Sequence, residues 1–123
     1  MPFTGNAALT SDLDVLVPSA PVTATGNSGP LNGYGPAKVI RAQLEVTAVS
    51  GTTPTLDVVI EDTLDGVNWN VIGTFTQATV ATRQVLNIAT SFAETIRVRY
   101  TVGGTTPSFT FSVRAYFEGG AGA

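Results

Sequence analysis

The sequence predicts an all-β protein, an antiparallel β-sandwich (jelly-roll or Ig-like) of about seven to eight strands with an extended N-terminal arm. Three observations support this class. Apolar and polar residues alternate in short runs, which is the period of a half-buried strand. Turn residues separate the runs at intervals of about 8–12 residues, as in sandwiches and barrels. No segment shows a sustained helical period with caps, and 123 residues suit one domain.

The first 35 residues differ in composition from the rest and contain four of the seven prolines. Proline restricts short apolar runs such as 13–17 and 22–25 to edge strands or extended segments, because it cannot donate a backbone hydrogen bond. We therefore predict three parts. They are an extended N-terminal arm at 1–35, a β-sandwich domain at 36–118 and a flexible tail at 119–123.

The predicted domain consists of alternating runs that end at recognisable turns. Asp65-Gly66 forms a hairpin turn, because both residue types tolerate positive φ. Other turns are expected at 50–54, 91–94 and 103–107, and a loop at 76–82. The predicted strands cover 39–49, 56–61, 69–75, 85–88, 96–102 and 109–117.

Segments 49–56 and 102–109 share a Gly-Thr-Thr-Pro turn at an offset of 53 residues. After the turn their apolar positions coincide, but before it they fall one residue out of step. A one-residue slip reverses the faces of a strand, and a β-bulge near Ala48-Val49 would reconcile the two segments. We interpret them as two hairpins built on the same turn, with an ancient duplication as the alternative.

The composition excludes several classes of function. The chain has no Cys and no His, which rules out a Ser-His-Asp triad and disfavours zinc, copper and haem sites. With six basic residues and a net charge of −3, it lacks the clustered positive face that nucleic-acid binding needs. Arg97, Arg99 and Arg114 could form a small patch, but pairing with Glu45, Glu94 or Glu118 is the favoured interpretation. No apolar stretch approaches a membrane span, so we expect a soluble protein made in a cytoplasm.

Carboxylate chemistry is the remaining catalytic option. Glu61, Asp62 and Asp65 lie close in sequence, and Asp12 and Asp14 form a second pair. A glycosidase needs two carboxylates facing each other across a cleft, and a calcium loop beginning at Glu61 would need a bidentate Glu where Ile72 stands. We interpret these carboxylates as solvent-facing charges and expect no enzymatic activity, no metal and no cofactor.

Trp69 is the single tryptophan and lies in phase with Val67 and Val71. We interpret this shared phase as the core face, so that Trp69 is buried together with the two valines. The alternative is an exposed indole that stacks on sugars, as in a carbohydrate-binding module.

Segments 50–62 (SGTTPTLDVVIED), 64–69 (LDGVNW) and 96–111 (IRVRYTVGGTTPSFTF) resemble small β-sandwich structural proteins of tailed-bacteriophage virions, particularly capsid decoration (cement) proteins. The likeness covers residues 38–117. It implies a virion component on the capsid surface that is synthesised in the host cytoplasm. It further implies a homo-oligomer, with a trimer favoured, that binds the major capsid protein and bridges coat subunits.

An extended N-terminal segment could add to a sheet edge of the capsid or of a neighbouring subunit. The alternative is that it wraps its own domain. If it binds a partner, deleting residues 1–20 should weaken attachment and leave the domain folded. The alternative function is a carbohydrate-binding module or a fibre- or tail-associated component. The predicted partner-binding residues are Leu13, Val15, Val17, Val22 and Tyr34.

Overall fold

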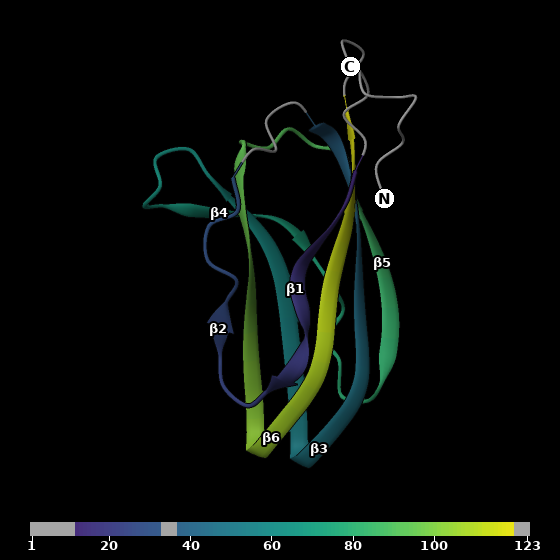
Figure 1. The fold of residues 1–123 in the computed structure, drawn as a ribbon. Helices are drawn as coiled ribbons and strands as arrows, with labels where there is room; N and C mark the ends of the chain where they lie inside the picture. The colour runs from purple at the N-terminus through teal and green to yellow at the C-terminus, as the bar shows by residue number, and fades with distance from the viewer. Residues whose placement is uncertain (1–11, 33–36, 120–123) are drawn as a thin grey trace.

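The computed structural model describes residues 12–32 and 37–119, which form strands and their connections and contain no helix (Figure 1). All strand pairings are antiparallel. The predicted all-β antiparallel class is therefore confirmed. The predictions for 1–11, for Tyr34 and for 120–123 lie outside the described residues. The strands are β1 (Asp12–Val22), β2 (Gly26–Asn27), β3 (Ala37–Thr63), β4 (Trp69–Thr74), β5 (Thr82–Ile88) and β6 (Thr95–Gly119).

The two long strands, β3 and β6, pair with each other along almost their whole length. Both fold over at the lower end in Figure 1, so that each has two arms, one in each of two layers. The first arm of β3 (37–50) pairs with the second arm of β6 (108–119). The second arm of β3 (55–63) pairs with the first arm of β6 (95–103). The described part of the chain thus has six strands where the sequence suggested seven or eight, because pairing continues through the bend.

The shorter strands flank these paired arms. In one layer β1 lies beside β6 and β5 beside β3, and in the other β2 lies beside β6 and β4 beside β3. Counting each arm separately along the chain gives the neighbour orders 1-8-3-6 and 2-7-4-5. That is the order of a jelly roll, so the pairing selects this architecture over the Ig-like one.

Within the described residues, the buried apolar side chains form one core between the layers. The rings of Tyr100 and Phe111, from different arms of β6, meet edge to face at a centroid distance of 5.4 Å, a favoured aromatic geometry. The inward positions follow the predicted alternation. The side chains with no measurable exposure are Ile40, Ala42, Leu44, Leu56, Val58, Ile60, Ile96, Val98, Phe109, Phe111 and Val113.

The predicted β-bulge is confirmed in the first arm of β3. Val46 pairs with Phe111 and Ala48 pairs with Thr110, so Thr47 is the extra residue. The bulge changes which face of β3 points inward: Val46 is buried before it, and Val49 packs against the core after it. The mismatch between the two similar segments therefore arises from an inserted residue.

The interpretation of the repeated Gly-Thr-Thr-Pro segments as two hairpins is wrong. The arms that flank each segment pair with the other long strand and not with each other. The two segments meet at the corner with nearly the same geometry: φ is 111° at Gly51 and 109° at Gly104, and 47° at both Thr53 and Thr106. Each glycine lies against the backbone of the opposite segment. The repeated turn is thus the bend of one folded two-stranded ribbon.

Within the predicted N-terminal arm, β1 and β2 belong to the same sheet as the rest. Leu16 and Val17 are buried in the core, and the pairing of β1 with β6 is irregular between Val17 and Ala20, where Pro18 stands. Proline at an irregular edge strand fits its missing donor. Deleting residues 1–20 would remove these core side chains, so, in contrast to the expectation from the sequence, we predict that this truncation destabilises the domain.

Candidate functional site

The β3–β4 hairpin, at one end of the molecule, has a turn that is held by side-chain hydrogen bonds. Its turn is held by Asp65, whose carboxylate accepts hydrogen bonds from the backbone N–H groups of Val67 (2.8 Å) and Asn68 (2.7 Å). Thr63 Oγ1 donates to the Asn68 carbonyl at 2.7 Å and accepts from Gly66 N–H at 2.8 Å. Gly66 has φ of 80°, as the predicted Asp-Gly turn requires. The hydrogen bonds from Asn68 and Val67 hold the pKa of Asp65 far below its usual range.

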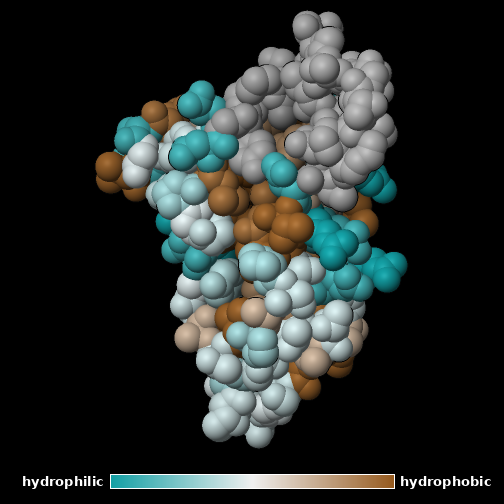
Figure 2. All heavy atoms as spheres, viewed as in Figure 1, coloured by the Kyte–Doolittle hydropathy of each residue, from teal (hydrophilic) through white to brown (hydrophobic). Residues whose placement is uncertain are grey.

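The tip of this hairpin is apolar and exposed. Leu64 is 86% exposed and Val67 77% exposed, and Figure 2 shows hydrophobic side chains on the protruding end at the upper left. Large apolar side chains are usually buried, and a group of exposed apolar side chains often marks a surface that binds another molecule. The sequence predicted Val67 to be buried, so the tip is one feature that sequence reasoning missed.

The predicted burial of Val71 and Trp69 in the core is also wrong. Directly paired residues share a face of the sheet, and Val71 pairs with Glu61 while Trp69 pairs with Thr63. Glu61 lies on the outer face, so Val71 and Trp69 lie there too. Val71 is 51% exposed, and Trp69 is half-buried.

On this outer face Glu61 binds two arginines of β6. Its Oε1 is 2.8 Å from Arg97 Nε and its Oε2 is 3.0 Å from Arg99 Nε. Glu61 is only 4% exposed. Burial raises the pKa of Glu61, but the hydrogen bonds and charges of the two arginines outweigh it and lower the pKa below its ordinary value. The Arg97 guanidinium also lies 4.2 Å from the centre of the Trp69 ring, within cation–π range.

These contacts correct the sequence interpretation of the charges. Arg97 and Arg99 pair with Glu61, and Glu45 pairs with Arg83 at 3.6 Å. Arg114 lies on the second arm of β6, in the other layer, so the three arginines do not form one patch. Glu61, which we expected to face solvent, is therefore buried. Its two arginine partners lie 36 and 38 residues away along the chain, so the local sequence pattern does not reveal this burial.

Asp62 is also buried, at 7% exposure, and its Oδ2 accepts a hydrogen bond from Ala93 N–H at 2.8 Å. Like Glu61 and Asp65, it is therefore engaged in holding local structure. Within residues 12–32 and 37–119, no group of three or more acidic, His or Cys side chains is placed to bind a metal ion. In the same residues no helix has the length and apolar character to cross a membrane.

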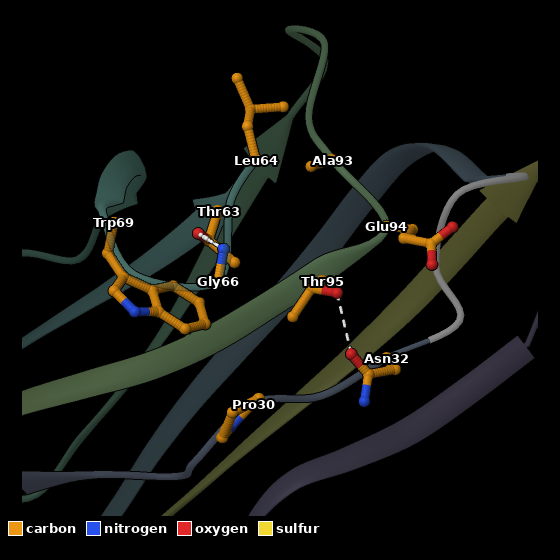
Figure 3. A pocket seen from close by; sticks show the side chains of 9 residues that line it. All are labelled: Pro30, Asn32, Thr63, Leu64, Gly66, Trp69, Ala93, Glu94 and Thr95. Carbon is orange, nitrogen blue, oxygen red and sulfur yellow. Dashed lines mark hydrogen bonds between the residues drawn. The ribbon is translucent and has the colours of Figure 1, made fainter.

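Beside the hairpin lies an open pocket of about 410 Å³ (Figure 3). The indole of Trp69 extends from the hairpin toward β6, and Asn32 accepts a hydrogen bond from Thr95 Oγ1 at 2.8 Å. Leu64 points away from the other labelled side chains. The pocket is lined by Pro30, Asn32, Thr63, Leu64, Gly66, Trp69, Ala93, Glu94 and Thr95.

The structure distributes the predicted partner-binding residues over different environments. Val15 is 57% exposed, Val17 is 8% exposed, and Val22 packs against the core. Leu13 pairs through its backbone with Tyr116 in the β1–β6 ladder. Of these, Val15 presents an apolar side chain to solvent. The described part of the chain presents further exposed apolar side chains at Val80 and Val85.

Neither a protein-family model nor a curated protein sequence matches the chain. Solved structures of similar fold include a chain of infectious bursal disease virus, Gx strain (TM-score 0.56, 12% identity, 92% of this chain and 33% of that one). They also include a chain of the T13 viral particle of the same virus (TM-score 0.57, 13% identity, 94% and 32%). A CBM22-1–GH10 xylanase of Clostridium thermocellum matches with a TM-score of 0.46, at 15% identity over 75% of this chain and 19% of that one.

The chain spans about a third of the length of the two virus chains. At these identities the two likenesses concern the fold alone. They show that the fold of nearly the whole chain recurs within those two longer chains.

Proposed function

We propose that this chain is a non-enzymatic virion structural protein, most specifically a capsid decoration protein that stabilises a phage head by bridging coat subunits. The observation that carries the proposal is the fold. Its strands have the jelly-roll order, and nearly the whole chain superposes on two virus chains. One of those chains comes from a viral particle. The sequence resemblance to phage decoration proteins supports the same role independently.

The surface suits a protein that spends its functional life in contact with other proteins. Charged residues make up 12% of the chain, about half the usual share. Apolar side chains are exposed at separate places, namely Val15 on β1, Leu64 and Val67 at the hairpin tip, and Val85 on β5. Several exposed apolar points on one small domain would let it contact more than one coat subunit.

The edges of the sheet differ in their capacity to accept another strand. The β1 edge is interrupted by Pro18 and Pro21, whereas β5 (Thr82–Ile88) pairs with β3 in regular register and contains no proline. An uninterrupted edge can accept a strand from a neighbour. We propose β5 as the edge at which copies of this chain associate, with a trimer as the expected assembly.

The proposal is tested by adding the purified chain to expanded capsids of the phage whose genome encodes it, prepared without the chain. We expect saturable binding in a fixed ratio to the coat protein, measured by sedimentation and quantitative mass spectrometry. We also expect a higher capsid melting temperature. No sedimentation with the capsid, or binding that rises without saturation, would contradict the decoration role.

A matched pair of variants tests the predicted partner-binding residues. Val15→Glu should weaken capsid binding, while Val80→Glu, at 65% exposure on the loop before β5, should bind like the unmodified chain. Truncation of residues 1–11, which ends before β1, replaces the deletion of 1–20. If Val15→Glu binds the capsid as well as the unmodified chain, Val15 is not part of the capsid-binding surface, and the proposed role itself is unaffected.

A place on a fibre, neck or tail is the alternative within the same class of protein. Locating the chain in intact virions by gold-labelled antibody distinguishes the two. Label over the head supports decoration, and label confined to the tail supports the alternative.

A further inference from the structure

The pocket beside the hairpin contains one aromatic ring and several polar groups whose hydrogen-bonding capacity is not fully used. Trp69 is half-buried on the outer face of its layer, and the Arg97 guanidinium lies over its ring at 4.2 Å. That contact fixes the orientation of the indole before any ligand arrives. A ring held in this way loses little further freedom on binding, which lowers the entropic cost of association.

Three polar groups around this pocket have unused hydrogen-bonding capacity within residues 12–32 and 37–119. The Asn32 carbonyl oxygen is engaged by Thr95, which leaves its two amide N–H donors. Within the same residues, the Trp69 indole N–H has no acceptor and the Glu94 carboxylate has no donor. Figure 3 shows Trp69 at one side of the pocket and Asn32 and Glu94 at the other side. The pocket therefore has an aromatic ring at one side and both amide donors and carboxylate oxygens at the other.

The charges around the pocket restrict the chemistry of its ligand. Arg97 and Arg99 both pair with Glu61. The other charged groups at the pocket are carboxylates, namely Glu94 in its lining and Asp62 and Asp65, which are bonded to the lining residues Ala93 and Thr63. A cationic ligand would approach a ring that already carries one guanidinium, and an anionic ligand would meet the Glu94 carboxylate. A neutral ligand with several hydroxyl groups avoids both repulsions and can use donors and acceptors together.

The size and lining agree with a small ligand of this kind. A volume of about 410 Å³ falls in the range of small-molecule sites, about 300–1,000 Å³. Such sites combine an apolar surface with a few polar groups that orient the ligand. Here Trp69, Pro30 and Ala93 supply apolar surface, and Asn32 and Glu94 supply the polar groups.

We propose that this pocket binds one pyranose ring of a neutral carbohydrate. The apolar face of the sugar stacks on Trp69, the Asn32 amide donates to ring hydroxyls, and the Glu94 carboxylate accepts from them. This binding activity goes beyond the virion role proposed above and does not depend on it, so the failure of either leaves the other standing.

The test titrates the full chain with five sugars, D-glucose, D-galactose, D-mannose, N-acetyl-D-glucosamine and L-rhamnose. Trp69 is the only tryptophan, so intrinsic fluorescence reports on the pocket directly. A ligand of about twelve heavy atoms in an open site should bind with a Kd of about 1 mM. We therefore expect a saturable fluorescence change with at least one sugar below about 20 mM, a limit set from that Kd.

Two variants examine the geometry of the site. Asn32→Ala keeps the fluorophore and should weaken binding by about fivefold or more, the effect of one lost hydrogen bond. The matched control is Asn70→Ala, which removes an exposed amide next to Trp69 on β4 that does not line the pocket. It should bind like the unmodified chain. Trp69→Leu, followed by saturation-transfer NMR, should abolish binding, and Trp69→Phe should partly restore it.

Circular dichroism melting of each variant separates loss of the site from loss of the fold. The proposal is overturned if none of the five sugars gives a saturable change. It is also overturned if Asn32→Ala and Asn70→Ala bind equally well, or if N-acetyl-lysine amide changes the fluorescence while the sugars do not. The last result would identify a site for basic side chains.

Discussion

Replacing Gly51 by alanine at the corner of the folded ribbon should destabilise the protein far more than an ordinary glycine substitution. Gly51 has φ of 111°, and a Cβ built on it would lie 2.7 Å from the Thr106 carbonyl oxygen and 2.9 Å from Pro107 Cα. The backbone conformation alone costs an alanine about 1–3 kcal/mol. The short contacts are with backbone atoms, which must move to relieve them, so we expect a total loss of about 2–4 kcal/mol.

That loss is large compared with the stability of a domain of this size. At about 0.05–0.15 kcal/mol per residue, 123 residues give a free energy of unfolding of about 6–18 kcal/mol. For a chain of this length 1 kcal/mol shifts the melting temperature by roughly 3–5 °C. Gly51→Ala should therefore lower the melting temperature by about 6–20 °C in a calorimetric scan.

A matched control separates the backbone cost from the steric cost. Gly29 has φ of 79° with no atom within 4 Å of a built Cβ. Gly29→Ala should therefore lose only about 1–2 kcal/mol. Gly104 faces the backbone of the other segment at the same distances as Gly51, so Gly104→Ala should match Gly51→Ala. If Gly51→Ala melts within about 3 °C of Gly29→Ala, the close approach of the two segments at the corner is not what stabilises it.

Three further substitutions test the core, the buried ion pairs and the hairpin. Phe111→Ala removes a fully buried ring that contacts Tyr100 and should cost about 3–5 kcal/mol in urea unfolding; a loss below about 1 kcal/mol would mean that Phe111 is not central to the core. Because the pKa of Glu61 is lowered on folding from 4.5, its contribution is fully present above pH 4.5 and is lost as the pH falls through the folded value. Glu61→Gln should reduce stability at pH 7 and flatten this acid dependence, and an unchanged pH profile would contradict the role of the two arginines. Asp65→Ala removes the acceptor for two backbone N–H groups and should speed amide hydrogen exchange at Val67 and Asn68 relative to the rest of the sheet, whereas uniform exchange would contradict the turn's dependence on Asp65.

The sequence correctly predicted the parts of the fold that depend on interactions between residues close together in the chain. The alternation of Ile96 and Val98 marks a buried strand because side chains alternate between faces. The Asp65-Gly66 turn follows from its tolerance of positive φ. The bulge at Thr47 was predictable because two similar segments were compared and one of them was out of step.

The incorrect predictions concern interactions between distant parts of the chain. The Gly-Thr-Thr-Pro segments look like hairpin turns locally, and only the pairing of β3 with β6 shows that they form a corner. Trp69 alternates in step with Val67 and Val71, which suggested a buried face. The pairing of Trp69 with Thr63 shows that this side of β4 is the outer face. Glu61 looks solvent-facing until Arg97 and Arg99 are seen across the strand pair.

The candidate site was less predictable than the fold for the same reason. Asn32 and Thr95 are 63 residues apart and meet only because the chain passes beside the start of β6. Trp69 was identified from the sequence as a possible sugar platform, but its exposure depends on the register of β4. The sequence therefore indicated one residue of the pocket, and the topology supplied the others.

The most direct test of the proposed virion role is to count this chain in purified virus particles. Virions produced by the genome that encodes it are purified on a density gradient, and the chain and the major capsid protein are quantified by mass spectrometry with labelled peptide standards. If the proposed role is correct, the ratio between the two is constant across preparations. A chain that is absent from the particles, or whose amount varies independently of the coat protein, would contradict it.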